Sequence, residues 1–191
     1  LLLGGITVLG VAVLVMVVLF FAFSKPKKTA EQQAAWTGVS GKLNAAWGCP
    51  DSQYARSIVP EKVSNEAFRI TAWKGERASA QIVLWSSKAI NGIDCAVSDF
   101  TSSVGTMPAS IAEARFVRYT LGDVRDENCR CRRPNGHPAI LQADMLDNLD
   151  RFDIPANSVR PVWITVNIPA DATPGVYNAK VKVSHNGCGS I

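Results

Sequence analysis

Hydrophobic and polar residues alternate most regularly near the end of the chain, over residues 160–183. In the first half of this stretch one face is aliphatic and the other mostly polar: Val162, Ile164, Val166 and Ile168 against Trp163, Thr165 and Asn167. A period of two predicts a β-strand with one face on a core. Pro169 and the turn pair Pro174-Gly175 predict a loop, because proline cannot donate to a ladder. Alternation then resumes over residues 177–183, which predicts a second strand, antiparallel to the first and beside it.

The same pattern recurs upstream, with turn residues at roughly the 8–12-residue spacing of a β-sandwich. Alternating runs occur at 68–72, 78–85, 93–97 and 115–121, with a shorter first element at 44–48. Asn91-Gly92 predicts a hairpin turn, and the serine-, glycine- and threonine-rich residues 101–109 predict a loop. We therefore predict an all-β fold, an antiparallel β-sandwich of roughly eight strands, preceded by an N-terminal hydrophobic helix.

The first 23 residues carry no charged side chain. A membrane-spanning helix needs about 20 apolar residues, and the core of a signal peptide needs about 7 to 15. We divide the chain into a signal peptide or transmembrane anchor at 1–23, a linker at 24–40 and a β-sandwich domain at 41–191. The length favours an anchor, which would place residues 1–23 in the membrane, and three lysines at 25–28 argue against export of the C-terminal side. On the residues alone, cleaved signal and retained anchor both stay open.

Residues 123–138 show no periodic pattern. A loop of this length inside a compact domain is usually functional or part of an interface. We identify as candidate domain-interface or glycan contacts three of its side chains and one tryptophan on the polar face of its strand: Asp126, Arg132, Arg133 and Trp163. The next segment, 142–153, fits either a helix or an extended strand. Its aspartates recur every three residues, which predicts a solvated face or loop caps rather than a calcium site.

The chain has five cysteines: Cys49, Cys95, Cys129, Cys131 and Cys188. Cys129 and Cys131 are too close in an extended chain to bridge each other easily. In an exported protein we therefore favour a disulfide that involves one of the two. The alternative is a zinc site that adds His137 and His185. Only one residue separates the two cysteines and no second pair occurs, so we predict no metal.

The sequence contains few residue patterns that are typical of an active site. Neither histidine lies in a known nucleophile setting, which excludes a catalytic triad. The adjacent acidic pair Asp126-Glu127 stands in an isolated polar loop, and no glycine-rich phosphate loop follows any strand. The net charge of +4 is mild and its basic residues are scattered, which excludes a nucleic-acid partner. We predict no catalytic residue and no cofactor in this chain.

Three tryptophans suit two different roles. Aromatic faces stack on pyranose rings, so Trp73, Trp85 and Trp163 could form a sugar-binding platform. Large aromatic side chains in a sandwich more often pack in the core or between sheets. We favour packing in the core or between domains for these three.

Three segments resemble the N-terminal β-sandwich of glycoside hydrolase family 123, the bacterial β-N-acetylgalactosaminidase-like proteins. They are the Pro-Ala-Asp-Ala-Thr-Pro-Gly-Val-Tyr loop at 169–177, the AWKGERASAQ segment at 72–81, and Leu141–Asp144 with Arg160–Trp163. The resemblance extends over residues 55–186. It stops where the catalytic barrel of the family would begin.

The resemblance implies a function that the residues alone do not give. Enzymes of this family act on N-acetylgalactosaminides through an Asp-Glu pair on the barrel. We therefore expect the non-catalytic N-terminal sandwich of a secreted glycoside hydrolase, with a C-terminal catalytic barrel as its partner. Export to the periplasm, the exterior or a membrane-anchored position is implied by the same resemblance. The alternative is a free-standing, membrane-tethered module that binds carbohydrate or protein.

Overall fold

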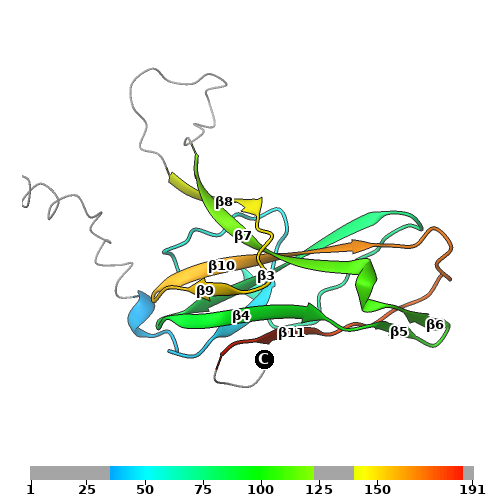
Figure 1. The fold of residues 1–191 in the computed structure, drawn as a ribbon, viewed down its shortest axis with the longest axis horizontal. Helices are drawn as coiled ribbons and strands as arrows, with labels where there is room; N and C mark the ends of the chain where they lie inside the picture. The colour runs from blue at the N-terminus through cyan, green and yellow to red at the C-terminus, as the bar shows by residue number, and fades with distance from the viewer. Residues whose placement is uncertain (1–34, 123–139, 187–191) are drawn as a thin grey trace, which may run out of the picture. The chain divides into compact units, whose positions relative to one another are not determined.

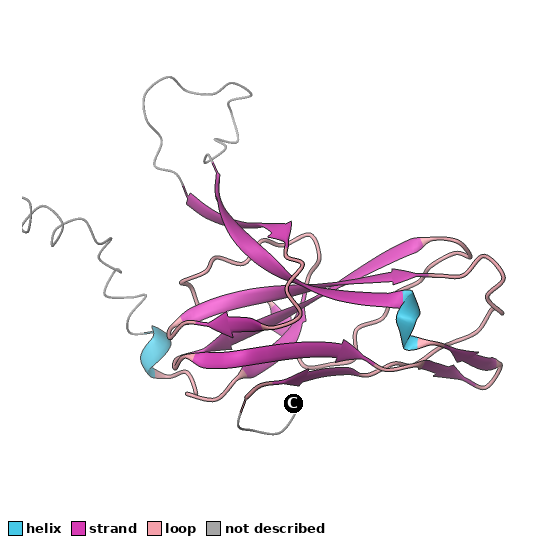
Figure 2. Cartoon of the chain, viewed as in Figure 1, coloured by secondary structure: helices cyan, strands magenta, loops and turns pink. Residues whose placement is uncertain are grey.

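The computed structural model describes residues 35–122 and 140–186, which lie in the compact unit Ala34–Ile191 (Figure 1). Almost all regular structure in these residues is β-strand (Figure 2). The strands are β1 (Asn44–Gly48), β2 (Val63–Ser64), β3 (Arg77–Ser86), β4 (Ile90–Val97), β5 (Phe100–Ser102), β6 (Gly105–Met107), β7 (Ala112–Gly122), β8 (Ile140–Leu146), β9 (Phe152–Ile154), β10 (Ser158–Asn167) and β11 (Val181–Ser184). A short 3-10 helix, η1 (Ala109–Ile111), precedes β7.

Six strands form the larger sheet, in the order β2-β1-β3-β10-β7-β8. At its centre β3 and β10 pair antiparallel over ten residues, from Ser158↔Ser86 to Asn167↔Arg77. The alternation predicted for residues 160–168 is confirmed, since Val162 and Ile164 are buried between the sheets and Trp163 is not. β3 is covered on both faces, because Val83 and its neighbour Leu84 are each 0% exposed.

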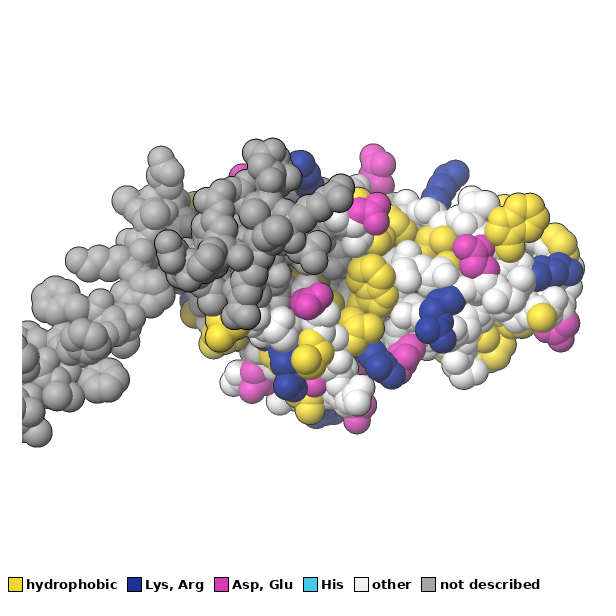
Figure 3. Space-filling model, turned by 90° about the horizontal axis from the view of Figure 1, so that it is seen from above, with side chains coloured by type: hydrophobic (Ala, Val, Ile, Leu, Met, Phe, Trp, Pro, Cys, Tyr) yellow, Lys and Arg dark blue, Asp and Glu magenta, His cyan; other side chains and the backbone are white. Residues whose placement is uncertain are grey.

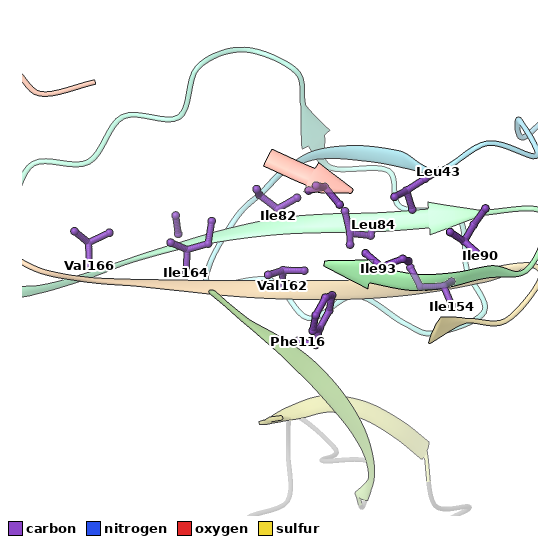
Figure 4. Packing of buried hydrophobic residues seen from close by; sticks show 12 residues of the cluster. Leu43, Ile82, Leu84, Ile90, Ile93, Phe116, Ile154, Val162, Ile164 and Val166 are labelled. Atoms are coloured by element: carbon purple, nitrogen blue, oxygen red, sulfur yellow. The ribbon is translucent and has the colours of Figure 1, made fainter. Parts of the chain in front are cut away.

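A smaller sheet, β11-β4-β9, packs against the larger one. The core between them consists of aliphatic side chains and one phenylalanine (Figure 4). Phe116 of β7 contacts Phe152 of β9 across the two sheets, with ring centroids 5.5 Å apart. The predicted antiparallel β-sandwich is therefore confirmed. The hairpin β5–β6 extends from the same layer.

The opposite face of the larger sheet carries a second buried cluster. Val83 of β3 and Val159 of β10 lie beneath Trp36 and Tyr54, which come from the segments before and after β1. The indole nitrogen of Trp36 donates to the carbonyl of Ser57 at 2.9 Å, which fixes these two segments to each other. We call this group the outer cluster, and it continues the hydrophobic layer beyond the sandwich core.

Two predicted elements differ from the structure. Asn91-Gly92 is not a hairpin turn: it lies inside β4, where the pairing with β9 shifts register between Ile90 and Ile93. Gly92 has a φ of 64°, so the same freedom that suits glycine to a turn here serves a bulge. Residues 68–72 are not a strand either, and Phe68 and Ile70 are exposed. Alternation alone does not supply the neighbouring strand that a ladder needs.

The strand predicted after the Pro169–Gly175 loop is real but shorter, and its neighbour differs from the prediction. β11 pairs with β4, from Val181↔Val97 to Ser184↔Asp94, whereas β10 lies between β3 and β7. The loop therefore crosses from one sheet of the sandwich to the other. A loop of about a dozen residues is long enough for such a crossing, while a direct hairpin connection usually has 2–5 residues.

Two further segments are extended. Residues 142–153, which fitted either a helix or a strand, contribute to β8 and β9, and residues 101–109, predicted as a loop, contain the β5–β6 hairpin. Within residues 35–122 and 140–186, no helix is long and apolar enough to cross a membrane. The hydrophobic segment 1–23 and the loop 123–138 lie outside the described residues.

Candidate domain-interface site

The hairpin of β7 and β8 departs from the larger sheet and forms an arm (Figure 1). β7 pairs with β10 from Val166↔Ala112 to Val162↔Phe116. Beyond Phe116 it pairs with β8, from Val117↔Leu146 to Gly122↔Ile140. A register shift between Arg118 and Tyr119 marks a bulge, which bends a strand and increases its twist. We call residues 117–122 and 140–146 the arm.

Arg160 occupies the position where β7 separates from β10. Its Nη1 donates to the carbonyl of Val117 at 2.7 Å, so the guanidinium takes the place of the lost ladder hydrogen bond. The same guanidinium lies 3.7 Å from the centre of the Phe152 ring and 5.1 Å from that of Tyr119. Arg160 is only 7% exposed. It thus connects three strands, β10, β7 and β9, at the base of the arm.

Burial shifts the protonation equilibria of Arg160 and Tyr119. It lowers the pKa of the Arg160 guanidinium from 12.5 to about 10, so the group stays charged at neutral pH. It raises the pKa of the Tyr119 phenol above its usual range, and the positive charge of Arg160 opposes that rise only in part. The neutral phenol donates to the carbonyl of Tyr54 at 2.9 Å. This bond connects the arm to the outer cluster.

Arg118 and Asp147 form a second brace. The guanidinium donates through Nε and Nη2 to the two carboxylate oxygens of Asp147, at 2.9 and 3.0 Å. The backbone N–H of Asp147 donates to the carbonyl of Phe116 at 2.8 Å. Asp147 is 7% exposed, so its assignment to a solvated face is wrong. Asp153 does cap a backbone group, since its carboxylate accepts from the N–H of Gly92 at 2.7 Å.

One face of the arm is apolar and exposed. Residues directly opposite each other in an antiparallel pair share a face, so Leu121 lies beside Leu141 and Val117 beside Leu146. Leu121, Leu141 and Leu146 are 74%, 43% and 39% exposed. We call Tyr119, Leu121, Leu141, Ala143 and Leu146 the arm face. The other face carries Arg118, Thr120, Gln142 and Met145.

On the face of the sandwich seen from above (Figure 3), charged side chains of both signs lie among the apolar ones. In the view from above, yellow apolar side chains alternate with Lys, Arg, Asp and Glu over the visible part of the sandwich (Figure 3). That surface is mixed rather than basic or acidic. The arm face is distinguished by three exposed leucines, Leu121, Leu141 and Leu146.

Trp163, the one candidate contact within the described residues, lies on the outer face of the larger sheet. Its cross-strand neighbours are Gln81 on β3 and Arg115 on β7. It belongs neither to the sandwich core nor to the outer cluster and is half-buried. Arg115 pairs with Glu113 on the same strand, at 2.6 Å. Part of the Trp163 side chain is therefore accessible on this face of the sheet, and its role as a contact stays a prediction.

The remaining candidates lie outside the described residues: Asp126, Arg132, Arg133, Cys129, Cys131 and His137. Their predicted contacts, the disulfide and the zinc alternative stay predictions. His185 is described, and its Nδ1 lies 3.3 Å from the carbonyl of Asn186. Cys49 and Cys95 are free thiols. Among the residues with a described placement, no group of three or more His, Cys, Asp or Glu side chains could hold a metal ion.

The three tryptophans have three different surroundings. Trp85 packs against the outer cluster, Trp163 lies on the sheet face, and Trp73 is 82% exposed in the turn before β3. The backbone N–H of Trp73 donates to the Glu76 carboxylate at 2.6 Å, and the N–H of Gly75 donates to the carbonyl of Ile168 at 3.0 Å. The packing role is therefore confirmed for Trp85 alone.

The residues that brace the arm were not identified from the sequence. Arg160 interrupts the apolar face of its strand, at the position two residues before Val162. A charged residue on the buried face of a strand is a usable signal, because such a group needs a specific partner. Asp147 gave no comparable signal among four evenly spaced aspartates.

A family model of the glycoside hydrolase 123 N-terminal domain matches residues 47–185. The chain belongs to this family. The matched region contains both sheets of the sandwich except the first three residues of β1, and the whole described part of the arm. The resemblance of the three sequence segments is therefore confirmed. A comparison with curated proteins gave no match.

A solved family 123 structure shares the fold of this glycoside hydrolase 123 N-terminal domain. It is a family 123 glycoside hydrolase from Clostridium perfringens, whose structural analysis concerns glycolipid glycan hydrolysis. The two superpose with a TM-score of 0.65 at 24% sequence identity, over 77% of this chain and 25% of that one. The matched region therefore spans about a quarter of the clostridial enzyme.

Proposed function

We propose that this chain is the non-catalytic N-terminal sandwich of an exported glycoside hydrolase that acts on N-acetylgalactosaminides. The observation that carries the proposal is the family match over residues 47–185. The clostridial relative, in which the corresponding region makes up 25% of the chain, supports a role beside a much larger catalytic part. In this proposal the sandwich packs on a catalytic barrel and helps to shape the substrate cleft.

Three of the described carboxylates have structural partners. Glycoside hydrolysis usually uses two carboxyl groups that flank the scissile bond. Here Asp147 is neutralised by Arg118, Glu113 pairs with Arg115, and Glu76 accepts from the backbone of Trp73. Each of these three acidic side chains has a structural partner. The proposal assigns the catalytic pair to the barrel, as the family resemblance implies.

The mass of the native protein in its source cells tests the proposal directly. An antibody against the sandwich is expected to detect a polypeptide several tens of kilodaltons larger than the 20.6 kDa of this chain. The immunopurified protein is expected to hydrolyse a chromogenic N-acetylgalactosaminide. A native product of 20.6 kDa or slightly less, without hydrolase activity, would refute the proposal.

Location is tested in the same cells. We expect protease added to intact cells or spheroplasts to degrade the sandwich, because the proposal places it outside the cytoplasm. A cytoplasmic marker serves as the control for lysis. Digestion that begins only after the cells are lysed would contradict export.

A second candidate function is carbohydrate binding by the sandwich alone, and the exposure of Trp73 favours it. An indole that is 82% exposed offers both faces to a sugar ring, and Glu76 fixes the backbone that carries it. The chain would then bind glycans on an array, and Trp73→Ala would abolish binding while Val176→Ala, at a side chain that is 81% exposed, would not. An array without signal for the wild-type chain would exclude this function.

A further inference from the structure

The arm face is the largest exposed group of aliphatic side chains that strand pairing places together within the described residues. Leu121 and Leu141 are directly opposite each other, and Leu146 lies on the same face nearer the sheet. A leucine that becomes fully buried contributes about 1.5–3 kcal/mol. Exposed apolar faces of this kind mark interaction surfaces, and scattered single apolar residues do not.

The arm is held in place at its base. Arg160 connects it to β9 and β10, Arg118 pairs with Asp147, and Tyr119 bonds to the carbonyl of Tyr54. The contacts of Arg160 and Tyr119 limit the movement of the arm relative to the sandwich, and the Arg118–Asp147 ion pair joins the two strands of the arm at their base. A two-stranded hairpin by itself is only marginally stable in water. The contacts at the base therefore help to hold the arm face in one position.

The position of the arm also agrees with the residues that carry the family resemblance. One of the three segments lies there: Leu141–Asp144 forms part of β8, and Arg160–Trp163 contains the arginine at the base. Of the other two segments, residues 72–81 lie in the turn at Trp73 and continue into β3, and residues 169–177 lie in the loop between β10 and β11. The family signature therefore includes the arm as well as the core.

We propose that the arm face docks onto the catalytic domain of the hydrolase. This inference rests on the proposed function and names the surface that mediates it. The clostridial relative extends well beyond the matched region, which is 25% of its chain, so a large covalently attached domain is available as the occupant. A covalently attached partner has a high effective concentration, and a few leucines then suffice for docking.

The arm offers a matched pair of variants for the test. Leu121→Glu with Leu141→Lys places a complementary ion pair on the arm face. Thr120→Glu with Gln142→Lys places the same ion pair on the opposite face of the same two strands, because Thr120 also lies directly opposite Gln142. Both double variants leave the net charge unchanged. Urea unfolding of each chain verifies that the sandwich still folds.

Both double variants are introduced into the full-length native protein, and limited proteolysis measures the release of the sandwich. We expect the arm-face variant to release it about tenfold faster than wild type, and the control variant to match wild type. Equal release rates for the two variants would overturn the docking surface while leaving the proposed function intact. A native protein of 20.6 kDa would overturn both.

A second copy of the chain is the competing occupant. Sedimentation of the 191-residue chain decides between them, with a monomer as the expected result. Self-association that the arm-face variant abolishes and the control variant retains would assign the surface to a dimer and overturn the proposal.

Discussion

At the residue scale, Arg160 combines a charge, a planar group and burial at one point of the fold. Its guanidinium donates to the Val117 carbonyl and lies over the Phe152 ring. Replacement by methionine retains much of the volume but leaves a buried carbonyl without its donor. Unsatisfied buried groups cost about 1–3 kcal/mol. Arginine stacks and donates in a fixed plane, so lysine is a poor substitute.

We expect Arg160→Met and Arg160→Lys each to lower the free energy of unfolding by about 2 kcal/mol in urea titrations. Arg115→Met is the control, because that side chain forms a surface ion pair with Glu113, and exposed pairs contribute at most about 1 kcal/mol. Equal losses for Arg160 and Arg115 variants would show that the base of the arm does not depend on Arg160.

The thiol of Cys95 makes the stability of the fold depend on pH. Burial, reinforced by the negative charge of Asp94, raises the pKa of its thiol from 9.0 to about 12. The folded chain therefore holds the proton more tightly than the unfolded chain. The resulting stabilisation is complete below pH 9 and is lost as the pH rises from 9 towards 12.

We expect the free energy of unfolding of wild type to fall, relative to Cys95→Ala, by about 1.4 kcal/mol per pH unit above about pH 9. The difference between the two proteins isolates this thiol from lysine and tyrosine titration. Alkylation followed by peptide mapping at about pH 8 is expected to modify exposed Cys49 much faster than Cys95. If the free energies of unfolding of wild type and Cys95→Ala differ by a constant amount above about pH 9, the raised pKa of Cys95 is wrong.

At the element scale, the sequence predicted β3, β7 and β10 as strands, and it predicted the buried face best for β10. β10 follows its alternation from Val162 to Asn167, because a one-residue slip would turn its aliphatic side chains to the other face. β3 is instead buried on both faces, and Leu121 near the end of β7 is exposed. The pairing partners were less predictable. Alternation after Gly175 located β11 but placed it beside β10, and only the loop crossing to the second sheet shows why it pairs with β4.

The hairpin turn predicted at Asn91-Gly92 was wrong, although the residue types fit it. The pair suits a two-residue hairpin turn, yet the chain uses it inside β4. Glycine is needed in either case because φ is positive, and the sequence does not distinguish a turn from a bulge. The strand predicted at residues 68–72 is absent for a different reason. These residues do alternate between apolar and polar side chains, but no described strand pairs with them.

Gly92→Ala tests the bulge. The φ of 64° alone costs an alanine about 1–2 kcal/mol, and its Cβ would clash with the Asn186 amide unless that side chain moves. We expect a loss of at least about 1 kcal/mol in thermal or urea unfolding. Gly38→Ala is the control, because nothing lies within 4 Å of its Cβ, and we expect it to change stability by less than about 0.5 kcal/mol.

At the scale of the whole molecule, the fold depends on contacts between distant parts of the chain. The central pair β3–β10 joins residues such as Arg77 and Asn167, which are 90 positions apart. The chain must bring such distant residues together before most of the apolar side chains can be buried. The sandwich was predictable from the sequence because many short alternating runs permit few other architectures. The arm and the contacts at its base were not predictable, because they arise from side chains that meet only in the folded chain.

We expect refolding of the chain to take milliseconds to seconds, as in other sandwiches with many non-local pairings. Stopped-flow tryptophan fluorescence measures this rate. Ten prolines add slower phases that a double-jump experiment separates. A main refolding phase in microseconds would contradict the long-range topology.

The outer cluster determines where an expression clone of this domain should begin. The family match starts at residue 47, but Trp36 is 3% exposed and covers Val83 and Val159. A clone trimmed to the matched boundary would remove Trp36 and Val39 and expose the part of those two valines that Trp36 covers, and it would also remove Leu43 from the sandwich core. Soluble protein should therefore be sought from clones that retain residue 35, and precipitation of the shorter form would reflect the trimming rather than the domain itself.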